Sequence, residues 1–223
     1  MSDEVELQIA WADVAPPSPR STEVLDDLVG RHRQPHRRYH GLRHVVWVLR
    51  HTRRLEAAIP ECAAGLPGYD AAVVTAAAWF HDAVYQPEAS DNEERSALLA
   101  EVQLASVGWT PARRTVVTDL VRATAAHLDD RDVAVGPARL EEQVLLDADL
   151  AVLGADPAGY AAYVSGVRGE YSHLSDADWA TGRANVVERL LARRSLYRTE
   201  PGRSWWDDRA RANLTAELAG LGR

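Results

Sequence analysis

Residues 71–85 read AAVVTAAAWFHDAVY, an apolar run long enough for about four helical turns. The run is apolar on every face, which predicts the central, buried helix of a helical bundle. Asp70 can cap its start, and Pro87 stops it shortly after its end. His81 and Asp82 nevertheless stand side by side within it. Because a buried, unpaired carboxylate costs several kcal/mol, a cationic side chain or a metal ion must compensate the charge of Asp82.

The rest of the chain also carries helix signals. Cap residues or first-turn prolines stand at Ser90 with Glu93, Thr110-Pro111, Asp156-Pro157, Ser175 with Asp178, and Ser204 with Asp207. Alternating strand patterns, hairpin turns and glycine-rich phosphate loops are absent from the sequence. We therefore predict an all-α fold, a single-domain helical bundle of roughly eight to ten helices over residues 21–223. Residues 1–20, which end in three prolines, are predicted to form a loosely ordered lead-in.

The composition narrows the class of protein. The 223 residues are 46% hydrophobic and 26% charged, which is typical of a soluble globular protein. The single Cys62 excludes a disulfide framework and a cysteine-based zinc site. No apolar run reaches the ~18 residues of a membrane span and the N-terminus is acidic, so we expect a cytoplasmic protein. The net charge of −8 argues against a general nucleic-acid binder.

A second apolar segment is interrupted by acidic residues. Residues 144–154 read VLLDADLAVLG, with Asp147 and Asp149 inside the run. On a helix these two side chains lie about 200° apart, so they cannot both point at one site. We expect one of them to face a site and the other to cap a helix or pair elsewhere.

Residues 39–44, which read YHGLRH, open another predicted helix, and His40 and His44 share one face of it. One of these histidines, the His81-Asp82 pair and one acid of residues 144–154 would supply two nitrogen and two oxygen donors. Such a set suits Mn, Fe, Co, Ni or Zn and leaves positions for water. Each piece alone has an ordinary explanation, either a hydrogen-bonded core histidine or a carboxylate paired with an arginine. Three such pieces on separate buried helices favour a metal site.

Arginines concentrate beside His44. Residues 31–54 contain eight arginines, five histidines and no acidic residue. A guanidinium group can pair bidentately with phosphate, so Arg37, Arg38 and Arg43 are candidates for holding an anion. The alternative is that most of these arginines lie on solvated helix faces.

In their order along the chain, these residues resemble the signature of the HD-domain superfamily of metal-dependent phosphohydrolases. That signature is a His, an adjacent His-Asp pair and a distant Asp, each on a different helix. Here it is carried by His44, His81-Asp82 and Asp149, with Asp147 as the alternative final ligand. Further stretches that look like a bacterial subgroup of this superfamily include Trp79–Tyr85, Asn92-Glu93, Arg168 with Glu170-Tyr171, and Trp179 with Gly182-Arg183.

The resemblance implies a helical domain of the HD type that hydrolyses a phosphate ester of a small molecule, such as a nucleotide. A divalent ion, one of Mn, Fe, Co, Ni, Zn or Mg, would activate the attacking water. His127 is the only histidine between Asp82 and Asp147. This favours a site with one metal ion over the two-metal sites of the superfamily's oxygenases. The resemblance also implies that Arg168 and Arg183 bind substrate.

Catalysis would involve Asp82 together with Glu93 and His127. Glu93 could be a general acid or base, or only the capping partner of Ser90. His127 could donate a proton, bind phosphate, ligate a second metal or interact with a helix dipole. His40 could bind substrate or be a polar residue at a helix start. The remaining histidines are expected at the surface: His32, His36, His51 and His173.

A non-catalytic regulatory protein of the HD type, which binds a metal or ligand without turnover, is the alternative function. The expected partner is a small phosphorylated molecule, and neither nucleic acid nor a membrane is expected. Trp205 and Trp206 could belong to the core or to the face of a homodimer.

Overall fold

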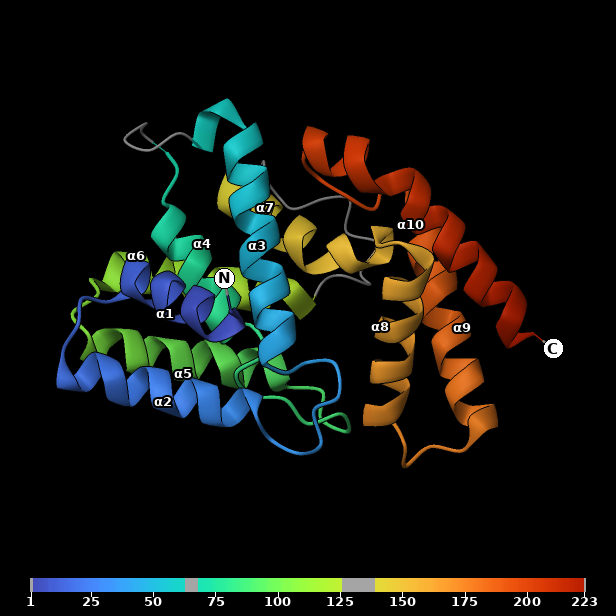
Figure 1. The fold of residues 1–223 in the computed structure, drawn as a ribbon, viewed down its shortest axis with the longest axis horizontal. Coiled ribbons are helices and arrows are strands. Elements are labelled where there is room, and N and C mark those ends of the chain that lie inside the picture. The colour runs from blue at the N-terminus through green and yellow to red at the C-terminus, as the bar shows by residue number, and fades with distance from the viewer. Residues whose placement is uncertain (1, 63–67, 126–138, 223) are drawn as a thin grey trace.

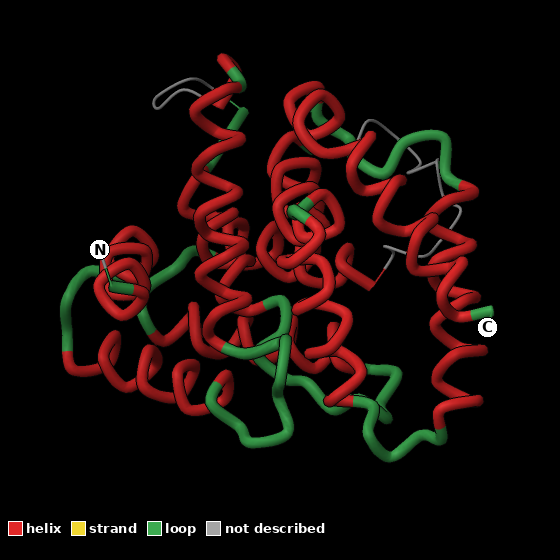
Figure 2. Tube along the Cα trace, turned by 45° about the vertical axis from the view of Figure 1, so that its right-hand side comes forward, coloured by secondary structure: helices red, strands yellow, loops and turns green. Residues whose placement is uncertain are grey.

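The computed structural model describes residues 2–62, 68–125 and 139–222, and these residues contain helices and loops but no strand (Figures 1 and 2). The predicted all-α fold is therefore confirmed for the described part of the chain. The helices are α1 (Asp3–Val14), α2 (Pro19–His32), α3 (Leu42–Ala58), α4 (Ala71–Phe80), α5 (Asn92–Ser106), α6 (Pro111–Ala123), α7 (Leu140–Leu150), α8 (Pro157–Glu170), α9 (Asp176–Ala192) and α10 (Glu200–Leu221), with short 3-10 helices at η1 (Pro60–Cys62) and η3 (Ala151–Gly154).

Helix α4 is the central helix, as its apolar sequence predicts. It contacts α1, α3, α5, α6 and α7, and all its residues from Val73 to Phe80 are buried. Asp70 caps it by accepting hydrogen bonds from the backbone N–H groups of Ala72 and Val73. The helix ends at Phe80, five residues before the predicted Tyr85, so that His81 and Asp82 lie on the turn that follows.

The guanidinium group of Arg37 explains this early end. It donates hydrogen bonds to the carbonyl oxygens of Asp82, at 2.6 Å, and Ala83, at 3.1 Å. Ser96 holds the same turn from the other side, because its hydroxyl accepts from the N–H of Val84 at 3.0 Å. These partners satisfy backbone groups that a longer helix would have paired internally.

The prediction of a loosely ordered N-terminus is wrong. Helix α1 packs on α3 and α4 through a buried face made by Leu7, Ala10, Trp11 and Val14. The indole N–H of Trp11 donates to the carbonyl and hydroxyl oxygens of Ser21, at 3.1 and 2.9 Å, which fixes α1 to α2. The prolines serve the turn between the two helices, and Pro19 occupies the first turn of α2.

Helices α8, α9 and α10 lie together on the side of the molecule away from α2 and α5 (Figure 1). The predicted starts of α8 at Asp156 and of α9 at Ser175 are confirmed, and both side chains cap their helices. The start predicted at Ser204 is wrong, because α10 already begins at Glu200 with Thr199 as its cap. The capping box predicted at Ser90 is also absent, since Asp91 takes the cap position of α5 without a side-chain hydrogen bond.

Two predictions about individual side chains can also be compared with the structure. His32 is buried, with 2% of its surface exposed, whereas a surface position was predicted. Trp206 lies in the core, and Trp205 packs partly buried against it. Within the described ranges, no helix is both long and apolar enough to cross a membrane.

Candidate metal centre

Three helix ends bring the predicted ligands together. His44 lies in the first turn of α3, His81 and Asp82 follow the last residue of α4, and Asp149 lies in the last turn of α7. Both α3 and α4 pack against α7, so the three ends meet. His44 and His81 are buried, and the Asp82 and Asp149 side chains keep 18% and 14% of their surface exposed. The cluster is therefore buried on the protein side and open on one face.

The donor atoms of these side chains are close to one another. The two histidine Nε2 atoms are 3.0 Å apart. Nε2 of His44 is 3.1 Å from Oδ1 of Asp149 and 3.4 Å from Oδ2 of Asp82. Nε2 of His81 is 3.2 Å from Oδ2 of Asp82 and 3.7 Å from Oδ1 of Asp149.

These separations fit one metal ion. Nitrogen and oxygen ligands that lie 2.0–2.2 Å from a common ion are roughly 3.0–3.5 Å from each other. His44, His81 and Asp149 form a group that could hold a metal ion, with His81 and Asp149, at 3.7 Å, slightly farther apart than this range. His81 also makes the outer hydrogen bond typical of metal-bound histidine, since its Nδ1 lies 3.0 Å from the carbonyl oxygen of Ala78. That bond places the proton on Nδ1 and leaves the Nε2 lone pair facing the cluster.

The electrostatics favour a cation at this position. Burial disfavours a charged imidazole, but the hydrogen bonds to Asp149 and Asp82 outweigh it and raise the pKa of His44 to about 10. The pKa of His81 is also raised, mainly by Asp82 against the effect of burial. Burial opposes ionisation of Asp82, yet His81 and its neighbours hold the pKa of that carboxyl well below its usual range. The two carboxylates thus attract positive charge, which a divalent ion would supply in place of protons.

The two acids of α7 have different partners. Asp149 faces the histidines, whereas Asp147 is fully buried and points toward the start of α10. The carboxylate of Asp147 accepts three hydrogen bonds at 2.7 Å, from the N–H of Arg198 and from the N–H and hydroxyl of Thr199. The structure therefore places Asp149, and not the alternative Asp147, in the cluster, as their angular separation on one helix requires.

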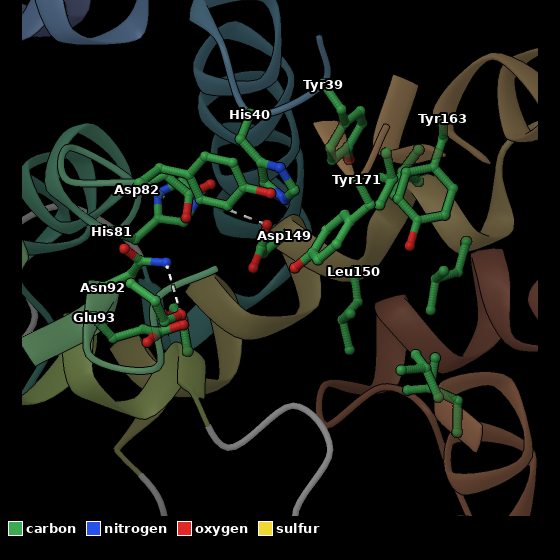
Figure 3. Close-up of a pocket in the computed structure, with 18 residues that line it drawn as sticks. Tyr39, His40, His81, Asp82, Asn92, Glu93, Asp149, Leu150, Tyr163 and Tyr171 are labelled. Carbon is green, nitrogen blue, oxygen red and sulfur yellow. Dashed lines mark hydrogen bonds and ion pairs between the residues drawn. The ribbon is translucent and has the colours of Figure 1, made fainter. Parts of the chain in front are cut away.

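A cavity of about 320 Å³ opens from the cluster. His40, His81, Asp82, Glu93 and Asp149 line its polar end, and aromatic and aliphatic side chains line the rest. Figure 3 shows His81, Asp82 and Glu93 on one side of the cavity, with Tyr163 and Tyr171 facing them across it. The structure thus brings Glu93 to the cavity wall next to the cluster. His127 lies outside the described residues.

Glu170, the last residue of α8, organises the loop that carries His40. Its Oε1 accepts hydrogen bonds from three consecutive N–H groups, those of Arg38, Tyr39 and His40, at 2.8, 2.8 and 2.9 Å. Its Oε2 lies 2.6 Å from Nδ1 of His40 and accepts from the hydroxyl of Tyr85 at 2.9 Å. Burial opposes its charge, but the bonds from His40 and the backbone lower the pKa of Glu170 to about 2. Glu170 therefore fixes His40 at the cavity wall.

In the sequence, Glu170 belongs to one of the stretches that resemble the HD-superfamily subgroup, but no role was predicted for it. A signal was nevertheless present, because Gly166 and Gly169 lie on one face of the same helix. A Cβ atom at Gly166 would lie 3.1 Å from Cβ of Tyr39, and one at Gly169 would lie 3.2 Å from Cγ of Arg38. Glycine weakens a helix interior, so two glycines three residues apart indicate that another segment packs closely there.

The structure does not bring the predicted substrate-binding arginines to the cavity, because each has another position or partner. Arg37 is buried beneath the loop and donates to backbone carbonyls, while Arg38 and Arg43 are exposed. Arg168 binds the turn between α8 and α9 and the carboxylate of Asp176. Arg183 forms a buried double hydrogen bond with Glu217, at 2.7 and 3.0 Å.

Comparison with known proteins gives no relative: no family model, curated protein or solved structure matches this chain. The fold class and the His-Asp cluster are therefore established from the chain's own residues, and membership of the HD superfamily stays a prediction.

Proposed function

We propose that this protein is a metal-dependent phosphohydrolase that uses a single divalent ion to hydrolyse the phosphate ester of a small molecule. The observation that carries the proposal is the convergence of His44, His81, Asp82 and Asp149 at the polar end of a cavity. The two histidine Nε2 atoms are 3.0 Å apart and lie 3.1–3.7 Å from the carboxylate oxygens. The order of these ligands along the chain, which resembles that of HD-domain phosphohydrolases, supports the same reaction.

The four side chains of the cluster would hold the ion. A divalent ion bound there would supply Lewis-acid chemistry, which neutralises phosphate charge and makes water acidic enough to react near neutral pH. The partly exposed faces of Asp82 and Asp149 leave the cluster open toward the cavity, where a phosphate group could approach. The buried faces of His44 and His81 exclude bulk water from the opposite side.

Two further side chains are placed to handle protons. Glu93 lines the cavity beside the cluster, and its carboxylate could accept a proton from the attacking water. His40 has its Nδ1 engaged by Glu170, so its Nε2 remains to face the cavity and could donate to a departing oxygen.

A protein that binds a metal or ligand without turnover is the second candidate. The specific observation in its favour is that none of the described arginines lines the cavity, whereas phosphate-binding enzymes commonly use arginine to hold the anion. Under this alternative, Glu93 would have no chemical role.

A panel of phosphate monoesters, assayed with the Mn²⁺-loaded protein, tests the proposal. We expect the wild-type protein to hydrolyse an ester and a chelator to abolish this activity. Asp149→Asn should be inactive, whereas the matched control Asp147→Asn should stay active. Glu93→Gln should lower kcat by about 10²–10⁴-fold while the bound metal is kept. Metal-loaded protein that hydrolyses no ester in the panel would favour the binding protein. Hydrolysis that is equal in Glu93→Gln would keep the phosphohydrolase and remove Glu93 from the proton transfer.

A further inference from the structure

The cavity beside the cluster has two chemically different ends. Carboxylates and imidazoles form one end, and the other is formed by side chains of η3, α8 and α9. We call this second end the apolar chamber and define it by Leu153, Tyr163, Val167, Val186 and Leu190. Figure 3 shows the division, with Asp82 and Glu93 on one side and Tyr163 on the other.

The tyrosine hydroxyl of the chamber is already engaged as a hydrogen-bond acceptor. The hydroxyl of Tyr163 accepts a hydrogen bond from the guanidinium of Arg183 at 3.1 Å. Val167 and Leu190 are buried, and they leave only carbon atoms on their part of the wall. A ligand group that enters the chamber therefore meets a largely apolar surface and gains by leaving water.

The charge of the cavity disfavours highly anionic ligands. Three carboxylates line it, those of Asp82, Glu93 and Asp149, and no arginine among the described residues does. One divalent ion neutralises two of the three negative charges, so the wall stays anionic around it. A single phosphate can be held by the ion, whereas the additional phosphates of a nucleoside triphosphate would face like charge.

The volume of the cavity suits a small organic group. An apolar cavity of about 150 Å³ is enough to hold benzene. The 320 Å³ found here has room for a group of that size together with a phosphate at the cluster. The volume, wall and charge thus all select the same kind of ligand.

We infer that the substrate class is a phosphate monoester of an apolar alcohol or phenol, whose phosphate binds at the cluster while its hydrocarbon or aromatic group fills the apolar chamber. This inference rests on the proposed metal-dependent function, and it departs from the expectation of a nucleotide.

Binding of alkylphosphonates, which resemble monoesters but are not hydrolysed, tests the inference without turnover. The affinities of methyl-, butyl- and hexylphosphonate, AMP and ATP for the Mn²⁺-loaded protein would be measured by calorimetry. Each buried methylene should tighten Kd by about three- to fourfold, so hexylphosphonate should bind far more tightly than methylphosphonate. ATP should bind no more tightly than methylphosphonate.

Variants of α9 locate the effect in the chamber. Val186→Phe fills part of it and should flatten the chain-length series, while Asn185→Phe, at an exposed neighbouring position, should leave the series unchanged. Val186→Thr keeps the side-chain shape and should weaken the series without the strain that a larger residue introduces. The helical circular dichroism and unfolding midpoint of each variant would be compared with those of the wild type.

The results for binding and for hydrolysis separate the two proposals. Affinity that rises steeply with phosphonate chain length, in a protein that does not hydrolyse hexyl phosphate, would support the apolar chamber and contradict the phosphohydrolase proposal. A flat series, an ATP affinity above that of hexylphosphonate, or no phosphonate binding overturns the inference. The phosphohydrolase proposal survives these results if hydrolysis is observed.

Discussion

The Asp147→Asn substitution removes the charge of a fully buried side chain and keeps its size. One oxygen of the Asp147 carboxylate accepts from the N–H of Arg198, and the other accepts from the N–H and hydroxyl of Thr199, all at 2.7 Å. An asparagine has one carbonyl oxygen, so it can keep the two bonds to Thr199 while its amide N–H₂ group faces the N–H of Arg198. One buried donor is then left without an acceptor and opposes another donor.

The loss of stability in Asp147→Asn can be worked out from these contacts. A buried donor without a partner costs about 1–3 kcal/mol, and the two remaining bonds lose their charge assistance, worth ~1 kcal/mol together. Burial raises the pKa of Asp147, which means that desolvation of the charge already offsets part of this energy in the wild type. We therefore expect Asp147→Asn to lower the free energy of unfolding by about 2–4 kcal/mol.

Urea unfolding followed by tryptophan fluorescence measures this loss, and the metal content of the same variant should equal that of the wild type. Gly202→Ala is an independent perturbation of the same contact, because a Cβ atom there would lie 2.5 Å from Oδ2 of Asp147. Loss of the metal at unchanged stability in Asp147→Asn would show that Asp147 is a ligand and not a structural acceptor.

Three further predictions concern stability. Glu170→Gln should cost about 2–3 kcal/mol in urea unfolding, because an amide cannot accept from His40 and the loop N–H groups as the carboxylate does, whereas Glu88→Gln at an exposed position should change stability by less than ~0.5 kcal/mol. Burial and the charge of Arg37 lower the pKa of His32 to about 3. Between pH 6.5 and 3, His32 is therefore protonated only in the unfolded chain, so the free energy of unfolding must fall as the pH is lowered through that range. Between pH 7.5 and 5.0 the wild type should therefore lose about 2 kcal/mol more than His32→Gln, and equal losses would contradict the assignment. Trp11→Ala should cost about 3–5 kcal/mol and Val5→Ala, on the exposed face of the same helix, close to nothing; a small effect at Trp11 would mean that α1 is not part of the core.

The buried helices and the His-Asp cluster could be predicted because ionisable residues stand within otherwise apolar segments. An apolar run such as residues 71–85 has few alternatives to burial, so His81 and Asp82 within it had to have compensating partners. The opposite directions of Asp147 and Asp149 follow from helix geometry, although the sequence does not say which of them faces the histidines. That choice depends on the loop that leads into α10, which supplies the donors for Asp147.

The roles of the arginines could not be predicted, because an arginine reaches its partner through a long, flexible side chain. Arg37 lies close to His44 in sequence, yet its guanidinium group supports the backbone after α4. Arg183 meets its partner Glu217 from a helix far along the chain. In contrast, the burial of α1 could have been predicted, since Leu7, Ala10, Trp11 and Val14 follow the spacing of one helical face and only the neighbouring prolines suggested disorder.

We expect His44, His81, Asp82 and Asp149 together to bind one metal ion. Elemental analysis of the purified protein, after reconstitution with Mn²⁺, Fe²⁺, Co²⁺, Ni²⁺ or Zn²⁺ and removal of excess metal, tests it most directly. We expect about one ion per chain in the wild type and in Asp147→Asn, and loss of that ion in His81→Ala and Asp149→Asn. Wild-type protein that keeps no ion under any of these conditions, or His81→Ala protein that keeps a full equivalent, would contradict it.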